Sequence, residues 1–233
     1  KDGQQVKKFL AEISLNDTTF REEIEYVVAK PVIQIQSASV QALYANCGNK
    51  LNVQVPALGS AYNPSFRVKG GQSYSGKGGQ VTIVPNRTKE VVLSVYSDGN
   101  FIGTQSFNVR GIPKPDIVMT SGGREVDEKR GMSKPPREIT LVAEPDESFK
   151  QFLPEDARYR VTKWEVTLAR GTRGLETKRV TGPRANITSF AAKARQGDRI
   201  VIEVKEVQRM NFKDQTETVS IPMGARIKQI PIN

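Results

Sequence analysis

The side chains that most often carry enzyme chemistry are scarce in this sequence. The chain has no histidine and one cysteine, Cys47. Ser-His-Asp triads, Cys-His dyads and the usual zinc sites all need side chains that are therefore missing. Because one cysteine cannot form a disulfide within the chain, Cys47 is interpreted as a small buried or half-buried thiol.

Carboxylate pairs are the remaining candidates for acid–base chemistry. Two carboxyl groups catalyse glycoside hydrolysis only when they share a cleft and have different environments. The pairs here are next to turn and loop signals, and nothing in their spacing brings two of them together. They are interpreted as solvated surface charge: Glu22-Glu23, Asp127-Glu128, Asp146-Glu147 and Glu155-Asp156. The sequence predicts no catalytic residue, no metal site and no cofactor.

A glycine-rich stretch, GGQSYSGKGG from Gly70 to Gly79, invites comparison with phosphate-binding loops. Such a loop ends in Gly-Lys-Ser/Thr and opens a helix, so that backbone N–H groups face the phosphate. Here the ending is missing, and the stretch leads into the strand-like Val81–Pro85. A flexible loop between strands is predicted.

Basic residues form the best candidate contact surface. They lie on or beside one predicted hairpin: Arg170, Arg173, Lys178, Arg179 and Arg184. A hairpin tip projects from its domain, and arginine makes bidentate contacts, so docking to an acidic protein surface is the functional prediction, while a solvated surface that serves solubility stays the favoured alternative. The net charge is +10, but residues 113–233 mix 23 basic with 17 acidic residues. A nucleic-acid binder would show a basic stripe with interleaved aromatic residues, and no nucleic-acid partner is predicted.

The elements that must position these residues are mainly strands. At 233 residues the chain is long enough for about two domains, and no apolar run approaches the ~20 residues of a membrane-spanning helix. Residues 1–31 are interpreted as the C-terminal part of a preceding, truncated domain. In that segment the spacing of Val6, Phe9, Leu10 and Ile13 predicts a short amphipathic helix, and Phe20–Val28 alternates like a strand.

Residues 32–112 predict an immunoglobulin-like β-sandwich. About seven short alternating runs are separated by turn signals at regular spacing. The last two runs flank Ser97-Asp98-Gly99-Asn100, whose residues tolerate a positive φ in a tight turn. A joint follows at Gly111, Ile112, Pro113 and Pro115. Two prolines one residue apart hold the chain extended, so a semi-rigid interdomain connector is predicted.

Residues 113–233 predict a second, C-terminal β-rich domain. Its clearest strand is Arg160–Leu168, in which Trp164 is expected to be in the core. Ile187 to Ala194 predicts one short helix that Gly197 is well placed to end. The predicted fold class is mainly β, with tandem Ig-like β-sandwich domains in an elongated rod and one short helix in the last domain.

Three stretches carry a family resemblance. The stretch GTQSFNVRGIPKPD resembles the end of the third domain in the GldM/PorM family, the gliding-motility and type IX secretion proteins of Bacteroidetes. The matching residues are Gly103, Phe107, Val109, Arg110, Ile112, Pro113 and Pro115. YANCGNKLNVQVPA and QGDRIVIEVKEVQ are similar to two further family stretches, and the resemblance covers residues from about 32 to 233. Cys47 with Gly48 departs from the family pattern at that turn.

The resemblance implies a function beyond what the residues show. The family has an N-terminal membrane helix, outside this chain, that anchors a periplasmic rod of successive domains in the inner membrane. The rod is a homodimer and works with a small inner-membrane motor partner that uses the proton-motive force. Its C-terminal domain would be nearest to outer-membrane-associated ring proteins. The resemblance thus implies a non-enzymatic rod that transmits motion across the periplasm.

Two other classes of function stay open. A β-sandwich adhesin or carbohydrate-binding module would present exposed aromatic platforms, whereas aromatic residues make up 7% of the chain and occur mostly in strand patterns. A basic nucleic-acid binder would show strongly salt-dependent affinity for DNA. An enzyme comes behind all three.

Overall fold

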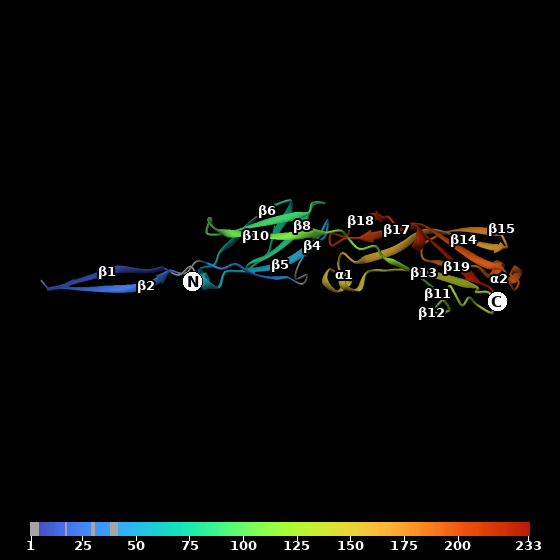
Figure 1. Cartoon of the computed structure of the whole chain (residues 1–233), viewed down its shortest axis with the longest axis horizontal. Helices are drawn as coiled ribbons and strands as arrows, with labels where there is room; N and C mark the ends of the chain where they lie inside the picture. Colours follow the sequence, from blue (N-terminus) through green and yellow to red (C-terminus); the bar gives the residue numbers. More distant parts are fainter. Residues whose placement is uncertain (1–4, 17, 29–30, 38–41) are drawn as a thin grey trace. The chain divides into compact units, whose positions relative to one another are not determined.

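The computed structural model describes residues 5–16, 18–28, 31–37 and 42–233. The chain is mainly β and divides into two compact units (Figure 1). The first unit comprises Lys1–Ala42 and Lys50–Asn108, and the second comprises Leu43–Asn49 and Val109–Asn233. Within the described residues, no helix has the length and apolar character needed to span a membrane.

The first described element is a two-stranded ribbon of β1 (Gln5–Leu15) and β2 (Thr18–Val28). The amphipathic helix predicted around Val6 to Ile13 is wrong, whereas the strand predicted at Phe20–Val28 is confirmed. In β1 the apolar residues fit both a helical and an alternating spacing, and pairing with β2 decides between them: Phe9 lies opposite Ile24, and Ile13 opposite Phe20.

Strands between residues 34 and 110 form two four-stranded sheets, ordered β4-β10-β9-β6 and β3-β5-β8-β7. Their bounds are β3 Gln34–Ser37, β4 Ala42–Tyr44, β5 Asn49–Gln54, β6 Pro64–Lys69, β7 Gly71–Ser75, β8 Gln80–Pro85, β9 Glu90–Ser97 and β10 Asn100–Arg110. A 3₁₀ helix, Pro56–Ala61, follows β5. Alternate residues of the central strands are fully buried, including Val53, Ile83 and Leu93. This is the predicted sandwich, with β7 added inside the stretch expected to be a loop.

The second unit has two further sheets, ordered β12-β11-β13-β16 and β15-β14-β17-β18, and β19 also pairs with β17. Their bounds are β11 Asp116–Ser121, β12 Arg124–Glu125, β13 Glu138–Glu144, β14 Arg158–Arg170, β15 Arg173–Thr181, β16 Arg184–Asn186, β17 Arg199–Met210, β18 Thr216–Val219 and β19 Ile227–Pro231. Trp164 lies in the core as predicted, 1% exposed, and its indole Nε1–H donates to the Gly182 carbonyl at 2.8 Å.

Three short helices belong to this unit: α1 Glu147–Phe152, α2 Thr188–Lys193 and α3 Met223–Arg226. The helix predicted at residues 187–194 is α2. Asp146 is the N-cap of α1: its carboxylate accepts the Phe149 N–H at 2.9 Å and thereby satisfies an otherwise unpaired donor of the first turn. The helix buries Phe149, which anchors the small cluster described next.

Candidate functional site

The predicted joint is seated on the second unit. The Tyr159 hydroxyl donates to the Pro113 carbonyl at 3.0 Å, and Pro115 is buried. Ile112 packs against a cluster of buried side chains. We call this cluster, with the polar network beside it, the junction seat; its buried members are Cys47, Phe149, Leu153 and Ala157. The prolines therefore fix the shape of the connector, while the junction seat holds its position.

The loop 43–49 supplies the other chain segment of the junction seat. Asn49 folds this loop onto itself: its Oδ1 accepts the Tyr44 N–H at 2.8 Å, and its Nδ2 donates to the carbonyls of Tyr44 and Cys47, both at 2.9 Å. The Tyr44 ring meets the edge of the Phe149 ring, with centroids 4.9 Å apart. At Gly48 a Cβ would come within 2.7 Å of the Phe212 ring, so only glycine fits there without a shift of that ring.

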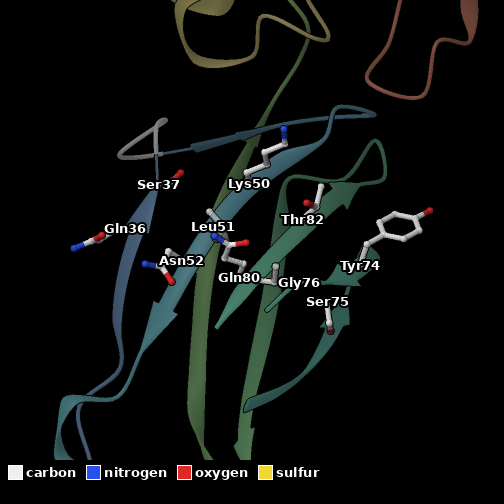
Figure 2. A pocket seen from close by; sticks show the side chains of 11 residues that line it. Gln36, Ser37, Lys50, Leu51, Asn52, Tyr74, Ser75, Gly76, Gln80 and Thr82 are labelled. Atoms are coloured by element: carbon white, nitrogen blue, oxygen red, sulfur yellow. The ribbon is translucent and has the colours of Figure 1, made fainter. Parts of the chain in front are cut away.

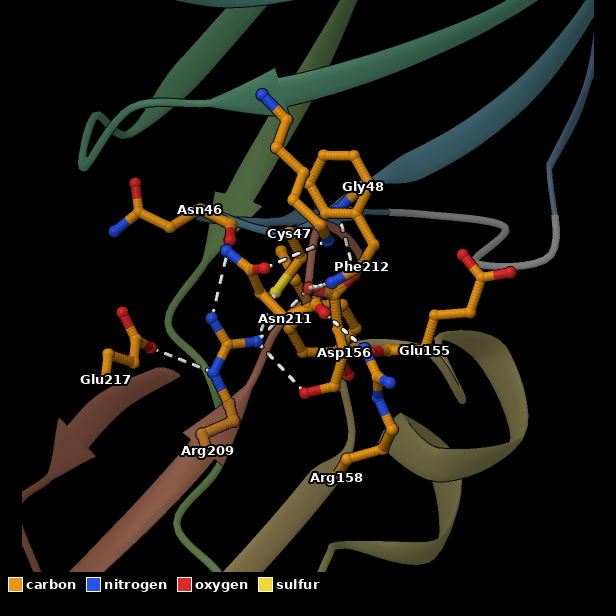
Figure 3. A network of polar contacts seen from close by, with 12 residues as sticks. Asn46, Cys47, Gly48, Glu155, Asp156, Arg158, Arg209, Asn211, Phe212 and Glu217 are labelled. Carbon is orange, nitrogen blue, oxygen red and sulfur yellow. Dashed lines mark hydrogen bonds and ion pairs between the residues drawn. The ribbon is translucent and has the colours of Figure 1, made fainter. Parts of the chain in front are cut away.

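A fully buried arginine, Arg209 on β17, joins this loop to the rest of the unit (Figure 3). Its Nη1 donates to the Asp156 carbonyl at 3.0 Å and lies 3.3 Å from the Asp156 Oδ1 and 3.4 Å from the Cys47 Sγ. Its Nη2 reaches the Asn46 carbonyl at 3.4 Å, and its Nε donates to Glu217 at 2.9 Å. All five N–H groups of a guanidinium are donors, so a fully buried arginine needs protein acceptors for each of them.

Asp156 is the buried counter-charge, 1% exposed. Besides Arg209, its carboxylate accepts backbone N–H groups from two directions: Gly48 at 2.9 Å and Phe212 at 3.2 Å. The interpretation of Glu155-Asp156 as solvated surface charge is therefore wrong for Asp156. A buried carboxylate is tolerated only when it is paired and hydrogen-bonded, and both conditions are met here.

The electrostatics of the junction seat favour a structural role for its residues over a catalytic one. Burial, followed by the charge of Asp156, raises the pKa of the Cys47 thiol to about 12. Burial also raises the pKa of Tyr159 above its ordinary value. A thiol nucleophile must be ionised, and the predicted buried thiol is confirmed, since Cys47 is 0% exposed. Among the described residues no group of three or more His, Cys, Asp or Glu side chains could hold a metal ion.

The predicted basic surface is spread over two faces of one hairpin and a third strand. Arg170 makes a bidentate pair with the buried Asp198, at 2.7 and 2.9 Å. Arg179 pairs with Glu165 at 3.0 Å while 90% of its side chain remains exposed. Lys178 pairs in register with the buried Val166 and so lies on the face of the hairpin that faces the core. Its Nζ donates to the Asn186 carbonyl at 2.9 Å.

The other two predicted basic residues lie at the ends of strands. Arg173 begins β15, and Arg184 begins β16 and pairs with Glu138. The five cations thus do not share one face, and four of them already have partners within the unit. Whether any of them binds a partner remains a prediction.

Sequence reasoning missed Arg209, Asp156 and Tyr159. One signal was present: Arg209 comes two residues after the apolar Val207 in β17, so both side chains lie on the same face of the strand, although the alternation of Ile200, Ile202 and Val204 alone would have placed Arg209 on the other face. A charged residue at a core position indicates a buried ion pair. The partner could not be found this way, because Cys47 and Asp156 are 162 and 53 residues away along the chain.

Two family models match the chain. The model of the GldM third domain matches residues 32–110, and the model of the GldM C-terminal domain matches residues 113–233. The chain belongs to the GldM family. Loop 43–49 therefore lies within the third-domain match, although it packs in the unit that contains the C-terminal domain.

Other comparisons add little. No curated protein matches the chain. One solved structure with a match is the Yersinia pseudotuberculosis adhesin InvE, which is 13% identical, with a TM-score of 0.25, over 86% of this chain and 58% of that chain. The chain thus spans little more than half of the adhesin structure, and at this TM-score the match carries no argument.

Removing the Arg209 guanidinium should strongly destabilise the C-terminal unit. We expect Arg209→Ala to lower the free energy of unfolding by about 3–5 kcal/mol, because Asp156 would stay buried without its counter-charge. Urea unfolding measures this change, and the rate of Cys47 alkylation should rise with it. Glu217→Ala is the matched control: its side chain is 45% exposed, and we expect a loss of about 1 kcal/mol or less. Equal losses in both variants would contradict the assigned role of the buried pair.

The Arg170–Asp198 pair should make stability depend on pH in the acid range. The hydrogen bonds from Arg170 are the main cause that lowers the pKa of Asp198 to about 2. Since the folded pKa lies below the unfolded value of about 3.9, the stabilisation is complete above pH 4 and is lost as the pH falls towards 2. Asp198→Asn should therefore be less stable than the parent at pH 7, with the difference shrinking between pH 4 and 2. Thermal unfolding across this range tests it, and a difference that stays constant from pH 7 to pH 2 would contradict the role of this pair.

Proposed function

We propose that this chain is part of a non-enzymatic periplasmic rod of the type IX secretion and gliding machinery. In this proposal an N-terminal helix outside the chain anchors the rod in the inner membrane. The rod is a homodimer, and it carries motion from a proton-driven inner-membrane motor to outer-membrane-associated ring proteins through its C-terminal domain. Matches to the third and C-terminal GldM domains, which together span nearly the whole chain, support the assignment to this machinery.

The observation that carries the mechanical part is the fixed joint. A flexible linker would absorb a displacement, whereas a transmitted force needs a connector whose conformation cannot change freely. Here the backbone of the connector is restricted by Pro113 and Pro115, and the Tyr159 hydroxyl binds the Pro113 carbonyl. Ile112 adds apolar packing on the same side. The connector is therefore an extension of the C-terminal domain rather than a tether.

The ribbon of β1 and β2 supports a homodimer. One face carries Phe9, Ile13, Phe20 and Ile24, opposite one another in register and 39–67% exposed. The opposite face is mixed: it carries Lys8 paired with Glu23 and Glu25, and Arg21 paired with Glu12, beside the exposed Val6, Leu10 and Val27. A two-stranded ribbon is marginal alone in water, and an apolar face of this kind marks an interaction site. A second copy of the ribbon offers the same apolar face, as a two-fold interface requires.

The basic hairpin remains the candidate contact with the ring. Arg179 is strongly exposed, and Arg173 is next to the turn at the end of the hairpin. Hairpin ends are common binding positions because a rigid sheet presents them. An acidic protein surface is the partner chemistry that fits them.

Charging the apolar face of the ribbon should abolish the dimer. We expect Phe9→Glu with Phe20→Glu to give a monomer, because two carboxylates cannot be buried without partners in an apolar interface. Sedimentation of the 1–233 chain measures the change. The control Lys8→Glu with Arg21→Glu alters the opposite face of the same ribbon and should leave the dimer intact. A parent chain that is monomeric at all concentrations, or a dimer unaffected by the first pair, would contradict a dimer through this face.

Releasing the joint should weaken force transmission without unfolding the domains. Tyr159→Phe removes only the hydroxyl that binds the Pro113 carbonyl, at an expected cost of about 1 kcal/mol. Pro113→Gly with Pro115→Gly removes the stiffness itself. We expect secretion and gliding to fall in cells whose full-length protein carries either change, most in the double variant, while thermal unfolding still shows folded domains. Normal secretion and motility in the folded double variant would disprove the joint's mechanical role.

A further inference from the structure

The first unit has a sheet face of unusual composition. On the sheet β3-β5-β8-β7 the outward positions alternate with buried ones such as Val53 and Ile83. Gln34 lies opposite Gln54, and Gln36 opposite Asn52, on β3 and β5. We call this surface the amide face; its residues are Gln34, Gln36, Lys50, Asn52, Gln54, Gln72, Tyr74, Gln80, Thr82 and Val84. None of the four strands contains a carboxylate.

The long strands of the second unit make their solvent-facing positions soluble in another way. On β14 and β17 the exposed positions carry ions of both signs, for example Lys163 with Glu206 and Lys205 with Glu203. Charged residues make up 26% of the chain. The amide face, whose only charge is Lys50, is therefore solvated differently from the outer face of β14 and β17. Neutral amides hydrate well, but they are distinctive because each one both donates and accepts hydrogen bonds.

The amide face is hollowed into a groove of about 580 Å³ (Figure 2). Gln36, Asn52 and Thr82 line it from three strands, and Tyr74 lines it from the edge strand β7. A volume of this size lies in the range of small-ligand sites, about 300–1,000 Å³. The groove is open rather than enclosed, which suits an extended ligand better than a compact one.

Parts of the lining are held in place before any ligand arrives. The Gln54 Nε2 donates to the Asn52 Oδ1 at 2.8 Å and to the Gly78 carbonyl at 3.2 Å. The Tyr74 hydroxyl donates to the Gln72 Oε1 at 2.8 Å, which restrains a ring that is still 42% exposed. Gly79, with φ +90°, packs so closely on β5 that a Cβ would be 2.2 Å from the Val53 carbonyl oxygen. Pre-ordering of this kind reduces the entropy that binding must overcome.

We propose that this groove binds an uncharged oligosaccharide chain. A sugar hydroxyl both donates and accepts hydrogen bonds. The side-chain amides of Gln36, Asn52 and Gln80 match this, because each donates through its nitrogen and accepts through its oxygen. The exposed Tyr74 ring offers an apolar surface with a polar end, which fits the C–H face of a sugar ring. The lining has no carboxylate for a cation and only Lys50 for an anion. This proposal does not depend on the rod function and would stand if that function failed.

A chemical-shift titration of the whole 1–233 chain tests the proposal. The probes are cellohexaose and the hexamer of N-acetylglucosamine, both neutral, with hexagalacturonate as the acidic comparator. We expect at least one neutral hexamer to shift amide signals of the groove residues. Tyr74→Ala and Gln36→Ala should each weaken that binding about five- to tenfold, in line with the contribution of one ring or hydrogen bond. Gln229→Ala removes an exposed amide of β19 in the second unit and should change nothing.

Each result of the titration either supports or overturns binding of a neutral oligosaccharide in the groove. Binding of a neutral hexamer that both groove variants weaken, and that 0.5 M salt leaves unchanged, supports the proposal. No response to either neutral hexamer overturns it. Binding that is equal in the parent, Tyr74→Ala and Gln36→Ala places the ligand elsewhere and also overturns it. Tighter binding of hexagalacturonate, lost in salt, would show that Lys50 and its surroundings select an anion instead.

Discussion

A guanidinium without exposed surface can be accommodated only if protein atoms replace all the water that its N–H groups would bind. In the second unit that condition organises the surroundings of Arg209. Asp156 supplies charge, and Glu217 supplies a partly exposed second carboxylate. The remaining acceptors, the Cys47 sulfur and the Asn46 carbonyl, come from a loop far away in the sequence. The arginine thus selects one position for that loop, because any other position leaves donors unpaired.

Because loop 43–49 depends on Arg209, the unit that contains the C-terminal domain also includes a segment from earlier in the sequence. The family models divide the chain between residues 110 and 113, but the contacts place loop 43–49 in the same unit as residues 109–233. The chain therefore passes between its two units three times, at 42/43, 49/50 and 108/109, instead of once. The Ala45 N–H also donates to the Arg110 carbonyl at 2.9 Å, so a hydrogen bond joins loop 43–49 to the segment that begins at residue 109.

The predictable part of this structure is the part that local patterns determine. Strict alternation in β5, β8 and β14 gave the strands, because a period of two leaves no other way to bury one face. The prediction for the segment around Phe9 was wrong because the spacing of its apolar residues fits both a helix and a strand. Only the pairing with the partner strand decides between the two. β7 was missed because Gly71-Gln72-Ser73 has no apolar residue to mark a buried face.

The charged part of the junction seat could not have been predicted, because Asp156 pairs there with Arg209 and Gly48, which are 53 and 108 positions away. The Pro-x-Pro joint was visible, since proline restricts the backbone wherever it occurs. Its attachment to Tyr159 was not, because no local pattern indicates which hydroxyl will reach a given carbonyl. Sequence therefore predicted a stiff connector, and only the structure adds that the connector is also held.

The three kinds of exposed surface in this chain make different physical demands. The apolar face of the ribbon costs free energy in water, which is why we propose a second copy as its cover. The outer positions of β14 and β17 are already neutralised by pairs such as Lys163–Glu206, so they need no partner at all. The amide face lies between these cases: it is stable in water but remains able to exchange water for another hydroxyl-rich molecule at little cost. A surface of that kind is suited to weak and reversible binding.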